Sequence, residues 1–118
     1  FVYVHPTPKD HGLENQIEGD LRPRQSVVLI ENQVNVGNNC LKVVEALRNN
    51  GCKVLGIVTI FDYGLPATYK KFEKAEVDLT ALTDFETVLR HAENLEIITH
   101  EQSKQLHAWQ RKPSKWTK

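Results

Sequence analysis

The chain has 118 residues, a length that suits a single domain with its own hydrophobic core. Its 15 basic and 15 acidic residues cancel to a formal net charge of zero, so we expect neither nucleic acid nor a membrane surface as a partner. The sequence shows no apolar run of membrane-spanning length and no signal peptide, and its two cysteines lack metal or disulfide-framework spacing, which favours a reducing, cytoplasmic location.

The first 19 residues are predicted to form a short strand followed by a long loop. Phe1 to Val4 read as a strand, which Pro6 and Pro8 would end because proline fixes φ and removes a hydrogen-bond donor. The polar stretch from Lys9 to Gly19 predicts a mobile loop, and loops of that length often act as lids. A strand pattern at the first residue and the lack of methionine indicate the C-terminal piece of a longer protein.

The stretch from Ser26 to Leu47 predicts a strand, a loop and a helix. Val27–Ile30 is continuously apolar, which is typical of a strand at the centre of a parallel sheet that is covered on both sides. Glu31 to Cys40 reads as a polar loop with one glycine, and Leu41 to Leu47 carries a helical apolar stripe. Such a loop faces the ligand crevice, and the next helix offers free N–H groups to an anion. We therefore place the functional site between Glu31 and Cys40.

The remaining sequence predicts a parallel α/β domain. Asn49, Asn50 and Gly51 supply a left-handed cap that ends the helix, and a second strand parallel to the first follows. In chain order we expect a strand over Lys53–Ile60, a loop over 61–66, a helix over 67–76, a strand over 77–82, helices opened by capping sequences at 83–86 and 99–102, and a loose tail over 112–118. The whole of 1–118 is predicted to be one domain.

Several segments together resemble the C-terminal two thirds or so of orotate phosphoribosyltransferases, which belong to the type I phosphoribosyltransferases. They are FVYV, PKDHGLENQIEG, VVLIE, LKVVEALRNNGCKVLGIVTIFDYGLP and LTDFETVLRHAE. The resemblance implies a twisted parallel sheet with helices on both faces, with the N-terminal part of the fold missing here, and a homodimer. It also implies transfer of ribose 5-phosphate from phosphoribosyl pyrophosphate to orotate in pyrimidine nucleotide biosynthesis, with Mg²⁺ bound to the pyrophosphate.

The family motif is a hydrophobic strand, two acidic residues and a loop of the kind Ser-Thr-Gly-Gly-Ser. Its carboxylates hold the ribose hydroxyls, and its small residues let backbone N–H groups close around the 5-phosphate. Glu31 matches the first acid and the neutral Asn32 stands at the second. In the loop, Asn35 and Val36 replace Ser-Thr, Gly37 matches, Asn38 stands at the second glycine, and Asn39 and Cys40 occupy serine positions. Together these losses should cost on the order of a thousandfold or more in binding or rate.

The predicted mobile loop is also altered. The family's lid has the pattern Arg-Lys-x-x-Lys-x-His-Gly and closes over the pyrophosphate. Lys9 and His11 match its second half, whereas His5 and Pro6 replace the first Arg and Lys. The resemblance therefore implies Lys9, His11 and Glu31 as catalytic residues. The helix histidines show no consistent ligand geometry, so no side chain is assigned to a metal.

Alternative interpretations stay open for these residues and for the function. Glu31 could be an ordinary strand-end acid, and the Asn-rich stretch is as readily a plain loop as a weak anion site. We expect Asn38 to crowd an anion and to outweigh the attraction of the helix end. The chain could be a weak or inactive transferase domain, part of a working enzyme with tolerated changes, or a non-catalytic dimerisation or regulatory module.

Overall fold

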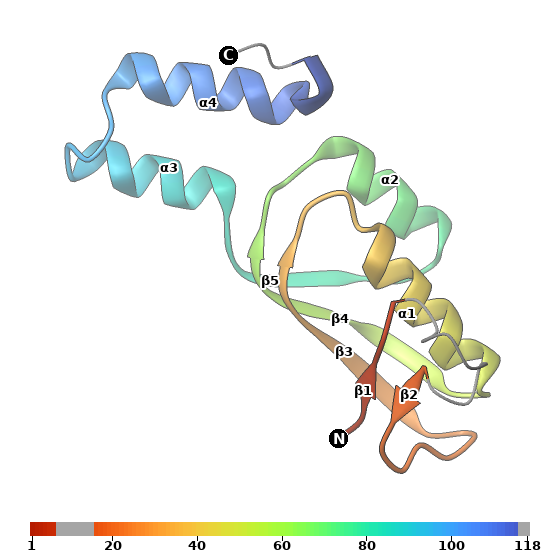
Figure 1. Ribbon diagram of the computed structural model, residues 1–118. Helices are drawn as coiled ribbons and strands as arrows, with labels where there is room; N and C mark the ends of the chain where they lie inside the picture. The colour runs from red at the N-terminus through yellow and green to blue at the C-terminus, as the bar shows by residue number, and fades with distance from the viewer. Residues whose placement is uncertain (7–15, 116–118) are drawn as a thin grey trace.

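The computed structural model describes residues 1–6 and 16–115 (Figure 1). Its elements in chain order are β1 (Tyr3–Val4), β2 (Ile17–Glu18), β3 (Ser26–Val34), α1 (Asn38–Asn49), β4 (Lys53–Asp62), α2 (Pro66–Lys74), β5 (Leu79–Asp84), α3 (Phe85–Asn94), α4 (His100–Arg111) and the 3-10 helix η2 (Pro113–Lys115). No helix among the described residues combines the length and apolar character that crossing a membrane requires.

The strands form two separate sheets. β3, β4 and β5 make a three-stranded sheet in that order, and both of its pairings are parallel. β1 and β2 make a small antiparallel sheet, in which Tyr3 pairs with Glu18 and Val4 with Ile17. The predicted parallel α/β class and the order of elements from β3 onward are confirmed. β2 was not expected, because its two residues fall at the end of the predicted loop.

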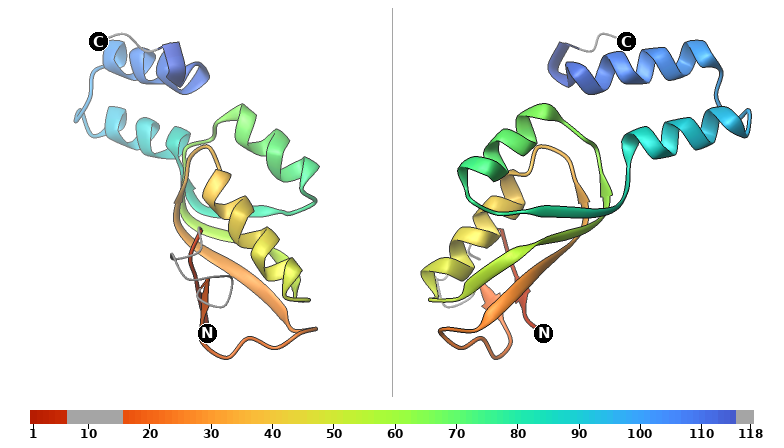
Figure 2. Two further views of the ribbon diagram at one scale, coloured as in Figure 1. Left: turned by 45° about the vertical axis from the view of Figure 1, so that its right-hand side comes forward. Right: turned by 180° about the vertical axis from the view of Figure 1, so that it is seen from behind.

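The core lies between this sheet and the helices α1 and α2, which lie on the same side of it (Figure 1). Its buried members include Val34 of β3, Ile57 of β4, Val44 of α1 and Phe72 of α2. α3 and α4 lie side by side beyond one end of the sheet, as both further views show (Figure 2). The domain is therefore elongated, with extents of 50 × 26 × 24 Å over the described residues.

The prediction that Val27–Ile30 is a central strand buried on both sides is wrong for the described residues. β3 is an edge strand of its sheet, and the side chains alternate along it. Val27 and Leu29 pack beneath α1, whereas Val28 and Ile30 are 47% and 64% exposed on the other face. An apolar run of this kind is typical of a strand that is buried on both faces. Among the described residues, only the face toward α1 is covered.

The predicted polar loop is shorter than expected. β3 continues through Glu31 to Val34, because these residues pair through their backbones with β4: Glu31 lies opposite Thr59 and Val34 opposite Asp62. α1 begins at Asn38, so only residues 35–37 connect the two elements. Much of the polar stretch is therefore held in a strand and in the first helical turn.

The two predicted helix starts differ in outcome. The capping box at Thr99 and Gln102 is confirmed, with both reciprocal hydrogen bonds present. At the start of α3 the cap is Asp84 rather than Thr83, and its carboxylate accepts a hydrogen bond of 2.7 Å from the Thr87 N–H. Thr83 still belongs to β5, where it pairs with Phe61, so the helix starts one residue later.

Candidate functional site

A cavity of about 370 Å³ lies where β3 ends and α1 begins. It is lined by Glu31, Gln33, Val34, Asn35, Val36, Gly37, Asn38, Asn39 and Cys40. The structure thus brings together the first acid of the predicted motif and every predicted loop position. Lys9 and His11, the predicted lid residues, lie outside the described residues.

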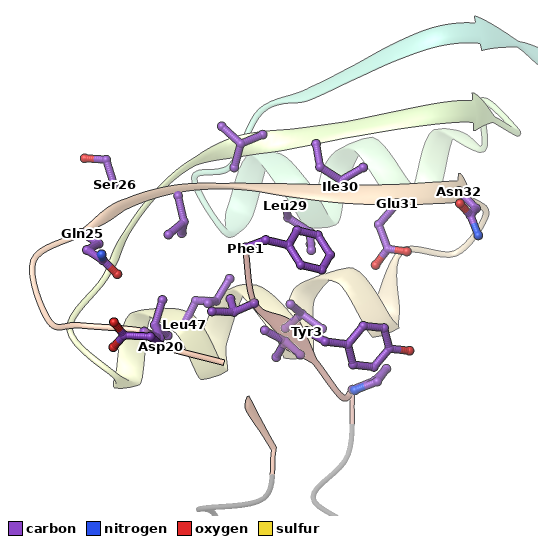
Figure 3. Close-up of a pocket in the computed structure, with 17 residues that line it drawn as sticks. Phe1, Tyr3, Asp20, Gln25, Ser26, Leu29, Ile30, Glu31, Asn32 and Leu47 are labelled. Carbon is purple, nitrogen blue, oxygen red and sulfur yellow. The ribbon is translucent and has the colours of Figure 1, made fainter. Parts of the chain in front are cut away.

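Asn32 is the one described site residue that does not line this cavity. It lies beside Glu31 at the same end of β3, and it borders a larger groove of about 670 Å³ between β3 and β1 (Figure 3). Phe1 and Tyr3 line that groove too, and Glu31 borders both spaces. Neighbouring residues of a strand point to opposite faces, which separates the two side chains.

Glu31 is paired with a buried thiol. Cys40, in the first turn of α1, is 4% exposed and donates a hydrogen bond to the Glu31 carboxylate. Burial raises the pKa of the Cys40 thiol to about 12, and the nearby carboxylate adds to that increase. Burial also raises the pKa of Glu31, while the bond from Cys40 opposes the change. The thiol therefore stays protonated at neutral pH and can donate this hydrogen bond.

Gly37 gives the loop its shape. Its φ of 72° lies in the left-handed region, and a Cβ there would be 2.6 Å from Cε1 of Phe72 and 3.0 Å from Cγ2 of Thr68. Its carbonyl accepts from the Leu41 N–H at 3.1 Å, and no side chain caps α1. The N–H groups of the first turn therefore lack a side-chain acceptor where an anion could bind.

Asn38 does not need the conformation of glycine. It is the first residue of α1 and has no positive φ, so the backbone accepts a side chain there. The Lys71 Nζ donates to its Oδ1 at 2.7 Å and to the Val36 carbonyl at 3.0 Å. The expected crowding of an anion by Asn38 thus finds no support in the backbone.

A second carboxylate at this end of the sheet was missed by the sequence analysis. Asp62, the last residue of β4, is 3% exposed and accepts from the Gly64 N–H at 2.9 Å and from the Tyr69 hydroxyl. Burial, followed by the bond and charge of Asp62, raises the pKa of Tyr69 to about 12. The sequence signal was the position of Asp62 after a buried strand, and both its partners lie in the segment that follows.

Phe61 and Tyr63 belong to an aromatic cluster at the end of β4. The Tyr63 ring lies 4.9 Å from the Phe61 ring and 5.9 Å from that of Trp109, measured between centroids. Phe85 joins this cluster at 5.5 Å from Trp109. The cluster therefore anchors α3 and α4 to the end of β4.

The comparisons with known proteins agree with this geometry. The curated orotate phosphoribosyltransferase of Porphyromonas gingivalis is 46% identical over 116 residues, which make up 98% of this chain and 55% of that protein. Over nearly its whole length the chain is therefore homologous to orotate phosphoribosyltransferases. It spans about half the length of the curated relatives it matches, which agrees with the expectation that it corresponds to only part of the family's length. No family model matches it.

Solved structures give the same family fold. The Leishmania donovani UMP synthase aligns with a TM-score of 0.76 and 23% identity over 98% of this chain and 24% of that one. The orotate phosphoribosyltransferase of Aeropyrum pernix aligns with a TM-score of 0.62 and 26% identity over 76% of this chain and 48% of that one. The three-stranded parallel sheet and its helices thus match part of the fold of these solved structures.

Replacing Glu31 by glutamine should stabilise the domain at neutral pH. A carboxyl whose folded-state pKa is raised contributes stability below its unfolded pKa, and that contribution is lost as the pH rises through the folded pKa. Glutamine cannot ionise, so Glu31→Gln avoids the stability that the domain loses when Glu31 ionises. Urea unfolding should therefore give a higher unfolding free energy for the variant at about pH 7 and nearly the same value as the unmodified chain at about pH 3. The control Glu45→Gln alters an exposed carboxylate of α1 and should change little. Equal effects of the two variants would contradict the prediction.

Proposed function

We propose that this chain is an orotate phosphoribosyltransferase-like domain that binds phosphoribosyl pyrophosphate weakly and has little or no transferase activity in this form. The observation that carries the proposal is the cavity at the end of β3. Among the described residues that line it, Glu31 is the only carboxylate. A transferase site needs negative charge beside a ribose ring that becomes positively charged in the transition state. Here that charge is reduced to a single group.

The proposed roles follow the geometry of the cavity. Glu31 would accept hydrogen bonds from the ribose hydroxyls, and the N–H groups of residues 37–40 would hold the 5-phosphate. Asn32 borders the other groove, and because it is neutral it cannot replace the second acid. Lys9 and His11 would contact the pyrophosphate as the remaining half of the family's lid. Orotate would be the acceptor of the ribose 5-phosphate, as in pyrimidine nucleotide biosynthesis.

The described residues fit magnesium that arrives with the ligand. Magnesium in such sites is held by one or two carboxylates together with substrate phosphates and water. No group of three or more His, Cys, Asp or Glu side chains suited to a metal occurs within residues 1–6 and 16–115. Glu31 could supply one oxygen ligand, while the pyrophosphate would supply the others. When bound, the cation would neutralise charge on the departing pyrophosphate.

A non-catalytic dimerisation or regulatory module is the second candidate function. The observation that favours it is the open face of the sheet, where Ile30, Ile60 and Leu82 are 64%, 54% and 74% exposed. Apolar side chains gathered on one face are typical of an interaction surface. In either role we propose a homodimer in the cytoplasm. Sedimentation equilibrium at increasing chain concentration would measure self-association.

We expect the isolated chain to form no orotidine monophosphate at a useful rate from orotate and phosphoribosyl pyrophosphate with Mg²⁺. The reason is the loss of the second acid and of the loop hydroxyls, which act together on one transition state. Spectrophotometric assay and calorimetric titration with phosphoribosyl pyrophosphate and Mg²⁺ measure the two properties separately. A turnover number near the ordinary enzyme range of roughly one per second or more would refute this proposal.

A further inference from the structure

Helix α2 holds the loop between β3 and α1 from behind through three side chains. The Thr68 hydroxyl donates to the Asn35 carbonyl at 2.5 Å, and the Phe72 ring fills the space beside Gly37. Lys71 makes the third contact, with bonds to the Val36 carbonyl and the Asn38 side chain. Thr68 and Phe72 are 1% and 2% exposed, so this support is part of the core.

The Lys71 contact decides where the Asn38 side chain lies. Asn38 lines the cavity, whereas Lys71 is not among the lining residues. The Asn38 carbonyl oxygen is therefore bonded to a cation outside the cavity. Asparagine has several staggered rotamers, and some of them would carry its amide toward the N–H groups of the first helical turn. A charge-assisted hydrogen bond favours one of these arrangements over the others.

We propose that Lys71 is a positioning residue for this loop: its ammonium holds the Asn38 side chain on the α2 side and keeps the cavity open to the 5-phosphate of a phosphoribosyl ligand. The part that concerns the ligand rests on the proposed function. The part that concerns the loop does not. Lys71 thereby offsets the presence of asparagine where the family motif has its second glycine. The bond to the Val36 carbonyl fixes the preceding peptide, so one side chain orders both ends of the Val36–Asn38 turn.

The experiment is a double-mutant cycle between positions 71 and 38. Lys71→Met keeps the unbranched apolar stem, one atom shorter, and removes the charge and the donors. Asn38→Gly removes the side chain that Lys71 holds. If Lys71 acts through Asn38, Lys71→Met should change amide exchange in the loop and phosphoribosyl pyrophosphate affinity less in the Asn38→Gly background than in the unmodified chain. Lys70→Met is the matched control, since it removes one charge from an exposed neighbour on α2.

Two readouts separate the proposal from the proposed function. Amide hydrogen exchange needs no ligand: Lys71→Met should speed exchange at Gly37, Asn38 and Asn39 about tenfold, and Lys70→Met should leave it unchanged. Equal acceleration by both lysine variants, or no acceleration by either, would overturn the positioning role. Phosphoribosyl pyrophosphate affinity is the second readout. No binding by any variant, together with the expected exchange pattern, would refute the proposed function and leave the positioning of the loop intact.

Discussion

Phosphoribosyl pyrophosphate should bind on the order of a thousandfold more tightly to the variant Asn32→Asp, Val36→Thr, Asn38→Gly, Asn39→Ser than to the unmodified chain. These changes restore the second carboxylate, two loop hydroxyls and the second glycine of the family motif. The two hydroxyls would be added at Val36 and Asn39, which both line the cavity. Each restored hydrogen bond to a charged phosphate contributes about 1.5–3 kcal/mol, so a few of them suffice for this gain.

The structure ranks the four changes. Asn38→Gly should contribute least, because Lys71 already bonds the Asn38 side chain outside the cavity. Asn32→Asp acts from the neighbouring groove, so its effect depends on ribose reaching that side of β3. Val36→Thr and Asn39→Ser alter residues that line the cavity and should supply most of the gain.

Isothermal titration calorimetry with Mg²⁺ present measures the affinities. The matched control is the same fourfold variant with Glu31→Gln added, which removes the carboxylate that lines the cavity and should cancel much of the gain. If the unmodified chain binds as tightly as the fourfold variant, the loop was never impaired, and the proposed weak or inactive state is wrong.

Gly37→Ala should lower the unfolding free energy by about 2–5 kcal/mol. The left-handed conformation costs an alanine about 1–2 kcal/mol, and forcing a Cβ to within 2.6 Å of the Phe72 ring adds an overpacking cost of about 1–3 kcal/mol. Phe72 is 2% exposed and joins a buried cluster with Val34 and Ile57, so it has little room to retreat. Urea unfolding followed by circular dichroism measures the change.

Gly51→Ala supplies a matched control for this second prediction. Gly51 has a similar φ of 77°, but the nearest atom to a Cβ there would be Cβ of Pro23 at 3.4 Å, an ordinary contact. Gly51→Ala should therefore lower the unfolding free energy only by the cost of the left-handed backbone conformation, about 1–2 kcal/mol. The difference between the two variants isolates the contact with Phe72. An equal loss at both positions would show that the ring does not constrain the loop.

Much of the fold could be predicted because its signals are local. The apolar stripe of α1 and the apolar run of β4 are visible in the sequence, and so is the capping box at Thr99. The end of β3 could not be predicted in the same way. Glu31 and Val34 are strand residues through backbone pairing with β4, and that pairing does not depend on their side chains.

The candidate site was predictable in position but not in its internal contacts. A parallel strand followed by a helix places Glu31 and Gly37 together by topology alone. The bond from Lys71 to Asn38 joins residues 33 positions apart, and the bond from Tyr69 to Asp62 joins a helix to a strand end. No periodic pattern encodes such pairs, because they depend on how α2 lies against the sheet.

The link between α4 and the end of β4 sets an order for folding during synthesis. The Gln110 amide donates to the Tyr63 carbonyl at 2.8 Å, across 47 positions of sequence, and the Trp109 ring packs against Tyr63. A growing chain can pair β3, β4 and β5 and close the Gly37 turn before these residues emerge from the ribosome. The peptide that follows β4 reaches its final contacts only after α4 has been synthesised. A nascent chain in which β5 has emerged from the ribosome but α4 has not would therefore hold the complete cavity beside an unanchored neighbouring loop.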